Sequence, residues 1–262
     1  MRYVIDAIRI NLRAAMQYRA SFLLQTLSQL IMTAGDLLAV LVLMDRFGHI
    51  GRWSPPEILL FFGAMQWTFA LTEILDRGLC TFSTEVRRGT FDAMLVRPRS
   101  PLKQVILSRL DPRRIGTMLV GLAAVLLATR TLGLTWTWDR VLLLLWSSLG
   151  TVALLMGLFL VEASVTFFTV QGLEAVNVLT YGGRQTCQYP VDVFPGPIRL
   201  LFLYVAPIAL TLHLPLGAIL GKPVLPWPAW AVWVSPCAGF AFFGLVTLLW
   251  RLGVRRYQSA GS

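Results

Sequence analysis

Residues 85–114 read EVRRGTFDAMLVRPRSPLKQVILSRLDPRR, and this stretch decides how the chain is organised. It holds eight of the 23 basic residues and is flanked by two long apolar runs. A segment with this much charge cannot lie in the hydrocarbon core of a bilayer, where polar groups find no water. We therefore expect it to form a surface on one side of a membrane that the apolar runs cross.

The composition also indicates a membrane protein. Of the 262 residues, 56% are hydrophobic and 14% are charged, which is more apolar than a soluble domain. The net charge is +10, but the cations gather in short segments between apolar runs. This is the positive-inside distribution rather than the footprint of a nucleic-acid-binding protein. Three widely spaced cysteines without a Cys-x-x-Cys pattern predict neither a zinc site nor a disulfide framework.

The apolar runs predict an all-α integral membrane protein, with six transmembrane helices in a single domain over residues 1–262. A helix rises about 1.5 Å per residue, so about 20 residues cross a bilayer core of about 30 Å. Near the end of the second span, Glu73 and Arg77 are four residues apart and are expected to pair on one helix face. The predicted spans are 22–44, 58–80, 115–134, 141–168, 169–189 and 228–251.

Residues 1–21 are expected to form an N-terminal interfacial helix. Their polar side chains recur at steps of three or four and so share one face, which suits a helix that lies along the membrane surface. A solvated leader is the alternative. The residues of the polar face are Arg2, Asp6, Arg9, Arg13 and Gln17.

Two topologies are open for residues 169–221. In the first, 169–189 crosses the membrane and 195–221 enters the outer leaflet as a re-entrant helical pair. In the second, 169–197 is a cytoplasmic loop and 198–220 crosses alone. We favour the first because residues 164–197 contain one basic residue, Arg184, which does not match a cytoplasmic loop.

The charge distribution of the first topology predicts its orientation. Sixteen basic residues fall on the side of the basic loop and six on the other side. The positive-inside rule therefore places the basic loop and both termini in the cytoplasm. Six tryptophans fall at the opposite boundary, where amphipathic rings are favoured. They are Trp53, Trp136, Trp138, Trp227, Trp230 and Trp233.

No constellation of residues indicates catalysis or a metal site. The two histidines, His49 and His213, lie in different outer segments and are expected to be structural or interfacial. Residues 217–222, GAILGK, are one residue too short between the glycines for a P-loop, and proline follows them. A membrane-embedded lipid-modifying enzyme that uses Glu162 or Glu174 is an alternative. An ATP-independent carrier or a membrane scaffold is another.

Charged residues inside the predicted spans are candidates for a transport path. A charge in the bilayer core is costly and needs a reason to be there. The alternative is that these residues pair between helices or lie nearer the surface than the span boundaries indicate. The candidates are Asp36, Glu73, Glu162, Glu174 and Arg184.

Within the basic segment, glycine and proline outline a short helix. Gly89 is a natural end for the preceding helix, Thr90 or Asp92 can cap the next one, and Pro98 ends it. A short helix with apolar residues and a rim of arginines suits the groove of a cytoplasmic partner. Attraction to anionic lipid is the alternative, but it does not require these glycine and proline positions. The expected docking residues are Arg88, Gly89, Thr90, Phe91, Asp92, Met94, Leu95, Arg97 and Pro98.

The order of these motifs resembles ABC-2 type transporter permeases. Arg88-Gly89-Thr90-Phe91-Asp92, Leu95, Arg97-Pro98 and Ser100-Pro101 resemble the cytoplasmic loop between the second and third spans of that family. Tyr189-Pro190-Val191, Phe194-Pro195 and Ala206-Pro207 are similar to its proline-marked outer re-entrant region. The turn at 51–54 and the ending at 257–262 resemble a bacterial subgroup in which permease genes neighbour one ATPase gene.

The resemblance implies the permease subunit of an exporter in the bacterial cytoplasmic (inner) membrane. Such a subunit dimerises, with a like or an unlike chain, and binds separate ABC ATPase subunits. Residues 85–114 would be the cytoplasmic coupling loop, with the coupling helix between Gly89 and Pro98. ATP and Mg would be bound by the partner ATPase, so no cofactor is expected in this chain.

Overall fold

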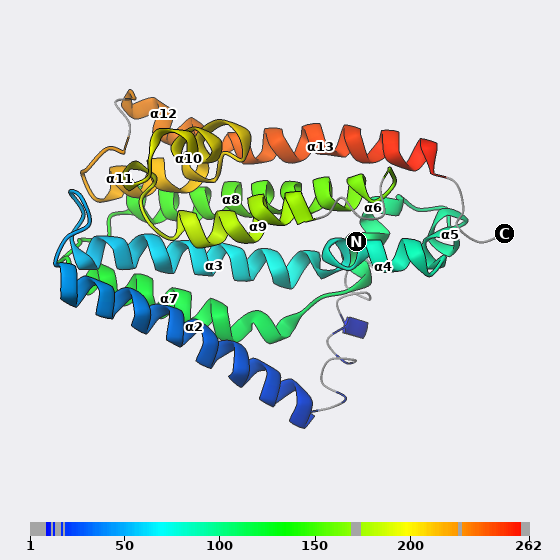
Figure 1. Ribbon diagram of the computed structural model, residues 1–262, viewed down its shortest axis with the longest axis horizontal. Helices are drawn as coiled ribbons and strands as arrows, with labels where there is room; N and C mark the ends of the chain where they lie inside the picture. The colour runs from blue at the N-terminus through cyan, green and yellow to red at the C-terminus, as the bar shows by residue number, and fades with distance from the viewer. Residues whose placement is uncertain are drawn as a thin grey trace.

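The computed structural model describes residues 9–11, 13, 17, 19–168, 174–224 and 227–257, which fold as a helical bundle (Figure 1). Five helices are long and apolar enough to cross a membrane. Their bounds lie within a few residues of predicted spans, apart from the start of the last one. The five are α2 (Arg19–Phe47), α3 (Pro55–Cys80), α7 (Ile115–Thr131), α8 (Trp138–Val165) and α13 (Cys237–Arg256).

The prediction that the last span starts at residue 228 is wrong. The apolar stretch divides into a short helix, α12 (Ala229–Val234), and the long helix α13. Pro236 stands immediately before α13, and proline removes a backbone donor and clashes with the preceding turn. The interfacial helix predicted over 1–21 lies largely outside the described residues. Among those described, Asn11 donates a hydrogen bond to the carbonyl of Leu107 at 3.2 Å.

Helix α3 is the centre of the bundle, enclosed along most of its length, whereas α2 is exposed along most of its own. Glycines let neighbouring helices approach backbone to backbone, as is common between membrane helices. A Cβ added to Gly63 of α3 would lie 2.7 Å from the carbonyl oxygen of Gly121 in α7. A Cβ added to Gly239 of α13 would lie 1.9 Å from the carbonyl oxygen of Gly150 in α8.

Ion pairs identify one end of the bundle, which we call the outer end. The carboxylate of Asp192 accepts hydrogen bonds from Nε of Arg52 at 2.9 Å and from Nε1 of Trp53 at 2.8 Å. Nζ of Lys222 lies 2.7 Å from a carboxylate oxygen of Glu57. Residues 192 and 222 are therefore both held beside the start of α3.

These contacts define the path of the chain between α8 and α13. After α8, Phe167 packs on Trp250 near the end of α13, at the opposite end of the bundle from Asp192. Helix α9 (Glu174–Cys187) runs between the two ends, beside α8. Because the chain is at the outer end at both 192 and 222, the segment between them leaves that end and returns to it. The connections of this path are those drawn in the first of the two topologies, but α9 has 14 described residues and is not among the five helices long and apolar enough to cross a membrane.

The segment that leaves and returns is a bent helical pair. Its arms, Gly196–Val205 and Ala209–Ile219, meet at 85° around the Ala206-Pro207 break. The first arm comprises α10 (Gly196–Leu200) and the π-turn η3 (Leu201–Val205). The second comprises the π-turn η4 (Ala209–His213) and α11 (Leu214–Ile219).

His213 connects the bent helical pair to the end of α9. Its ring is fully buried, with Nε2 2.7 Å from the carbonyl oxygen of Cys187 and Nδ1 3.2 Å from the backbone nitrogen of Val191. The geometry requires Nε2 to donate and Nδ1 to accept, as a neutral imidazole does. The structural role expected for His213 is the one observed.

Candidate functional site

The short helix predicted in the basic segment is α5 (Thr90–Leu95), which lies between α4 (Phe82–Arg87) and α6 (Pro101–Ser108) at the end opposite α10 and α11 (Figure 1). Gly89 separates α4 from α5 with a φ of 69°, a conformation that glycine adopts without steric cost. The predicted cap is wrong, because neither Thr90 nor Asp92 caps α5. The Thr90 hydroxyl instead donates to the backbone carbonyl and the carboxylate of Glu85.

Phe91 anchors α5 to the bundle. Its ring is fully buried, and its centroid lies 5.0 Å from Phe82, 5.7 Å from Phe167 and 5.2 Å from Tyr257. Trp250 completes the group, 4.9 Å from Phe82 and 5.1 Å from Phe167. We call these five residues the aromatic cluster; most of their pairs are edge-to-face, a favourable arrangement. Through the cluster, α5 is joined to the ends of α8 and α13.

The sequence predicts Phe91 as a contact for a partner, but the structure turns it inward. A six-residue helix has fewer than two turns, so one buried aromatic side chain fixes which face points outward. Leu95 is 37% exposed, and Val96, which sequence reasoning missed, is 84% exposed. We call the exposed residues around the end of α5 the docking face; they are Arg88, Leu95, Val96, Arg97 and Pro98.

Helix α6 holds the C-terminal end of α5. The side-chain amide of Gln104 donates to the carbonyl of Met94 at 2.9 Å and to that of Arg99 at 3.2 Å. Helix α6 in turn packs closely on α3, since a Cβ added to Gly78 would lie 1.8 Å from the carbonyl oxygen of Val105. Helices α5, α6 and the end of α3 therefore form one packed unit beneath the docking face.

A second group of functional candidates lies at the same end of α3. Glu73, whose side chain is 1% exposed, pairs with Arg114 at 3.0 Å, while Arg77 faces Asp111 at 3.9 Å. The predicted pair between Glu73 and Arg77 is therefore wrong. Asp76 leaves the helical conformation, with φ −118° and ψ 18°, and the resulting kink breaks the repeat that would place residues 73 and 77 on one face.

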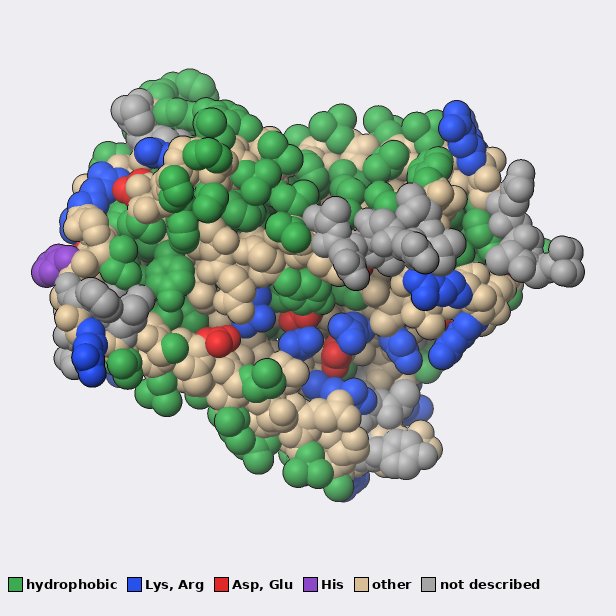
Figure 2. All heavy atoms as spheres, viewed as in Figure 1, with side chains coloured by type: hydrophobic (Ala, Val, Ile, Leu, Met, Phe, Trp, Pro, Cys, Tyr) green, Lys and Arg blue, Asp and Glu red, His purple; other side chains and the backbone are tan. Residues whose placement is uncertain are grey.

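Arg184 of α9 connects three helices. Its Nη2 lies 3.5 Å from Asp36 of α2, and its Nε donates to the side chain of Gln66 of α3 at 3.1 Å. Its guanidinium lies 5.1 Å from the ring centroid of Phe69. Figure 2 shows acidic and basic side chains gathered in the hollow between α2 and the rest of the bundle. A movement of α2 would therefore change the surroundings of Arg184 directly.

A polar cavity of about 190 Å³ lies beside the pair of Arg114 and Glu73. Arg114 also donates to the side chain of Gln29 in α2 at 2.7 Å, so one arginine links the wall of the cavity to the buried carboxylate. The lining is almost entirely polar. It consists of Gln25, Ser28, Gln29, Arg77, Asp111, Arg113 and Arg114.

The other predicted path residues are placed differently. Glu162 of α8 is half-buried, and one of its carboxylate oxygens has no hydrogen-bond partner among the described residues. Glu174 is the first residue of α9, and its side chain lies outside the described part of the structure. The structure therefore joins Asp36 to Arg184 and pairs Glu73 with Arg114. Sequence reasoning missed Gln66 and Arg114 as partners, because no local spacing connects them to α9 or to Glu73.

Comparison with known families gives an independent observation. Residues 30–261 match a family model described as ABC-2 family transporter protein, and this region includes α5, the aromatic cluster and Arg184. No curated protein and no solved structure matches the chain. In the described ranges, no group of three or more His, Cys, Asp or Glu residues could hold a metal ion.

Proposed function

Because this chain belongs to the ABC-2 family of transporter proteins, we propose that it is the permease subunit of an exporter driven by a separate ATPase. It is a multi-pass membrane protein and a transport component, and its family generally works with an ABC ATPase. ATP and Mg would be bound by that partner chain. The proposed location is the bacterial inner membrane, with the basic end and both termini in the cytoplasm.

The observation that carries the proposal is the two-sided packing of α5. Its outward side presents Leu95 and Val96 with arginines around them, a surface suited to the groove of a cytoplasmic partner. Its inward side is fixed by Phe91 to the aromatic cluster, which includes the ends of α8 and α13. A force applied to the docking face would therefore move two spans rather than only a surface loop.

The proposed transport path runs between α2 and the rest of the bundle. Asp36 and Arg184 connect α2 to α9, and their separation would open the polar hollow between these helices. Helix α2 also exposes apolar side chains along its length, including Leu24 at 67% and Met32 at 66%. A second permease chain or lipid would cover this surface, in keeping with a dimer that alternately exposes a shared cavity.

Co-purification with the candidate ATPase tests the docking face. Replacing Leu95 and Val96 with Asp puts two charges where apolar contact is expected, so the ATPase should no longer co-purify while the permease stays inserted. A matched control is Ile198→Asp in α10, because Ile198 is 38% exposed and Leu95 is 37% exposed, at opposite ends of the molecule. The docking assignment fails if the ATPase is retained by the Leu95 and Val96 variant, or if the control loses it equally.

A further inference from the structure

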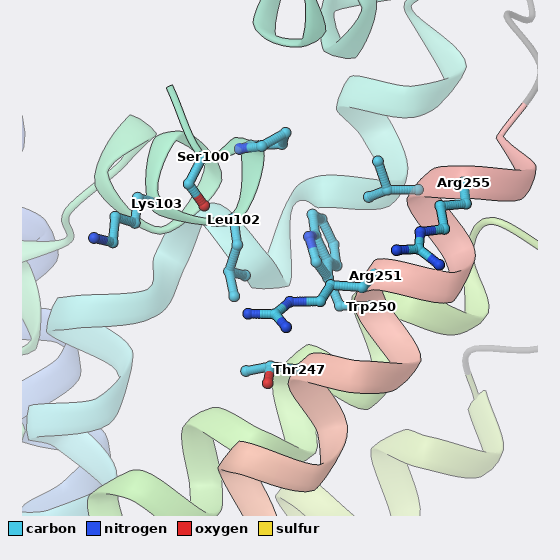
Figure 3. Close-up of a pocket in the computed structure, with 9 residues that line it drawn as sticks. Ser100, Leu102, Lys103, Thr247, Trp250, Arg251 and Arg255 are labelled. Carbon is cyan, nitrogen blue, oxygen red and sulfur yellow. The ribbon is translucent and has the colours of Figure 1, made fainter. Parts of the chain in front are cut away.

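A cavity of about 430 Å³ lies between α6 and the C-terminal half of α13 (Figure 3). Its wall on the α6 side is formed by residues 100–103. Its wall on the α13 side is a single helix face, since the lining positions recur at steps of three and four. No Asp or Glu is among the described residues that line it. The lining residues of α13 are Thr247, Trp250, Arg251, Val254 and Arg255.

Two arginines of α13 line this cavity, and Lys103 of α6 lies on its rim. In Figure 3, Arg251 reaches into the space between α13 and α6, Arg255 follows one turn later, and Lys103 extends from the rim. None of the three forms an ion pair within the described part of the chain. Cations without an acidic partner attract an anion, and the planar guanidinium of arginine suits two-pronged contact with phosphate.

The rest of the surface is apolar and continues toward the membrane. Leu102, Trp250 and Val254 line the cavity beside the arginines. On the adjoining face, α13 exposes Leu245, Leu248 and Leu252, at 66%, 52% and 53%. A cationic cavity that continues into an exposed apolar stripe fits a molecule with an anionic head and hydrocarbon tails. A free phosphate would make no use of the leucines.

We propose that this cavity binds the phosphate head group of an anionic phospholipid, with the acyl chains along α13. The proposal rests on the proposed function in one respect, the placement of this end of the molecule at the inner leaflet. Trp250 belongs both to the cavity and to the aromatic cluster, and Gln104 of α6 holds the end of α5. A bound lipid would therefore support α5 on the side opposite the docking face.

Native mass spectrometry of the full-length chain in a zwitterionic detergent tests the site, with dioctanoyl phosphatidylglycerol as the titrant. The variant Arg251→Gln/Arg255→Gln removes two cations from the cavity. The control Arg109→Gln/Arg256→Gln makes the same change in net charge at two exposed positions outside it. Each cavity arginine is expected to raise the affinity for phosphatidylglycerol about fivefold, which corresponds to about 1 kcal/mol. The cavity variant should therefore bind about 25-fold more weakly, and the control should change less than twofold.

Further titrants identify the source of the affinity. Dioctanoyl phosphatidylcholine and inorganic phosphate should not bind where phosphatidylglycerol saturates. Equal weakening in both double variants, equal binding of phosphatidylcholine, or saturable binding of inorganic phosphate would overturn the proposal. If the double variant misfolds, the single variants Arg255→Gln and Arg256→Gln, both at exposed positions, decide in the same way. Because the assay contains no ATPase, its failure is distinguishable from failure of the docking test.

Discussion

Gly239 lets α13 meet α8 backbone to backbone, and its replacement by alanine is expected to force the two helices apart. The added Cβ would lie 1.9 Å from the carbonyl oxygen of Gly150 and 2.7 Å from its carbonyl carbon. A relaxed contact between carbon and oxygen is about 3.3 Å, so the helices would have to separate by about 1.4 Å at this point. Both contacting atoms of Gly150 belong to the backbone, so no side-chain rotation can relieve the clash.

The same helix supplies a matched control. A Cβ at Gly244 would meet nothing within 4 Å, so alanine there gains only its helix preference, about 0.5–1 kcal/mol of stability. At Gly239 the same gain is opposed by overpacking, which costs about 3 kcal/mol at the upper end of the usual range. Gly239→Ala should therefore lose about 2 kcal/mol in free energy of unfolding, whereas Gly244→Ala should gain slightly.

Unfolding of the purified chain in mixed micelles, followed by tryptophan fluorescence, measures both variants under one set of conditions. The expected result is a shift of opposite sign for the two substitutions. Equal stability of Gly239→Ala and Gly244→Ala would refute the reasoning, because it would mean that the glycine contact does not set the spacing of α8 and α13.

Three further predictions concern the docking helix, the charged network and the topology. Phe91→Ala should destabilise the fold by about 3–5 kcal/mol and lower transport per ATP hydrolysed, while the ATPase still co-purifies; loss of ATPase binding would contradict the inward role of Phe91. Glu73→Gln should cost about 3 kcal/mol in unfolding assays, because it breaks an ion pair whose carboxylate side chain is 1% exposed. Asp36→Asn should cost less than about 1 kcal/mol, because the Asp36 side chain is 42% exposed and Arg184 keeps its hydrogen bond to Gln66 and its contact with the Phe69 ring; the reverse ranking would refute this. In a background without the native cysteines, Gly196→Cys should react with a membrane-impermeant maleimide from outside the cell, and labelling only from the cytoplasm would contradict the proposed orientation.

The long spans could be predicted from the sequence because a bilayer imposes both their length and their lack of charge. Their ends were less predictable, since an apolar run does not show where a helix breaks. Residues 229–234 are as apolar as the start of α13, and Pro236 rather than hydropathy separates the two helices. The bent pair at 196–219 was expected from its prolines, but its return to the outer end depends on partners in distant segments, such as Glu57 for Lys222.

The candidate site, too, could be predicted from the sequence only in part. Gly89 was recognisable because a glycine between two polar helical segments commonly ends a helix, and the structure gives it a positive φ. The inward direction of the Phe91 ring could not be predicted, because its ring partners come from the other half of the chain; they are Phe167, Trp250 and Tyr257. A six-residue helix is also too short for hydrophobic periodicity to identify its inner face.

The ion pairs at the outer end impose an order on biosynthesis. Glu57 is 5% exposed, yet its partner Lys222 follows 165 residues later, and Arg52 meets Asp192 only after 140 residues. When α3 of the newly made chain is inserted, the ion-pair partners of its outer end have therefore not yet been synthesised. These ion pairs form only after the second half of the chain has emerged from the ribosome. A nascent chain that stalls before Lys222 would leave the Glu57 carboxylate without its ion-pair partner, although the backbone nitrogen of Ser54 would still donate to it.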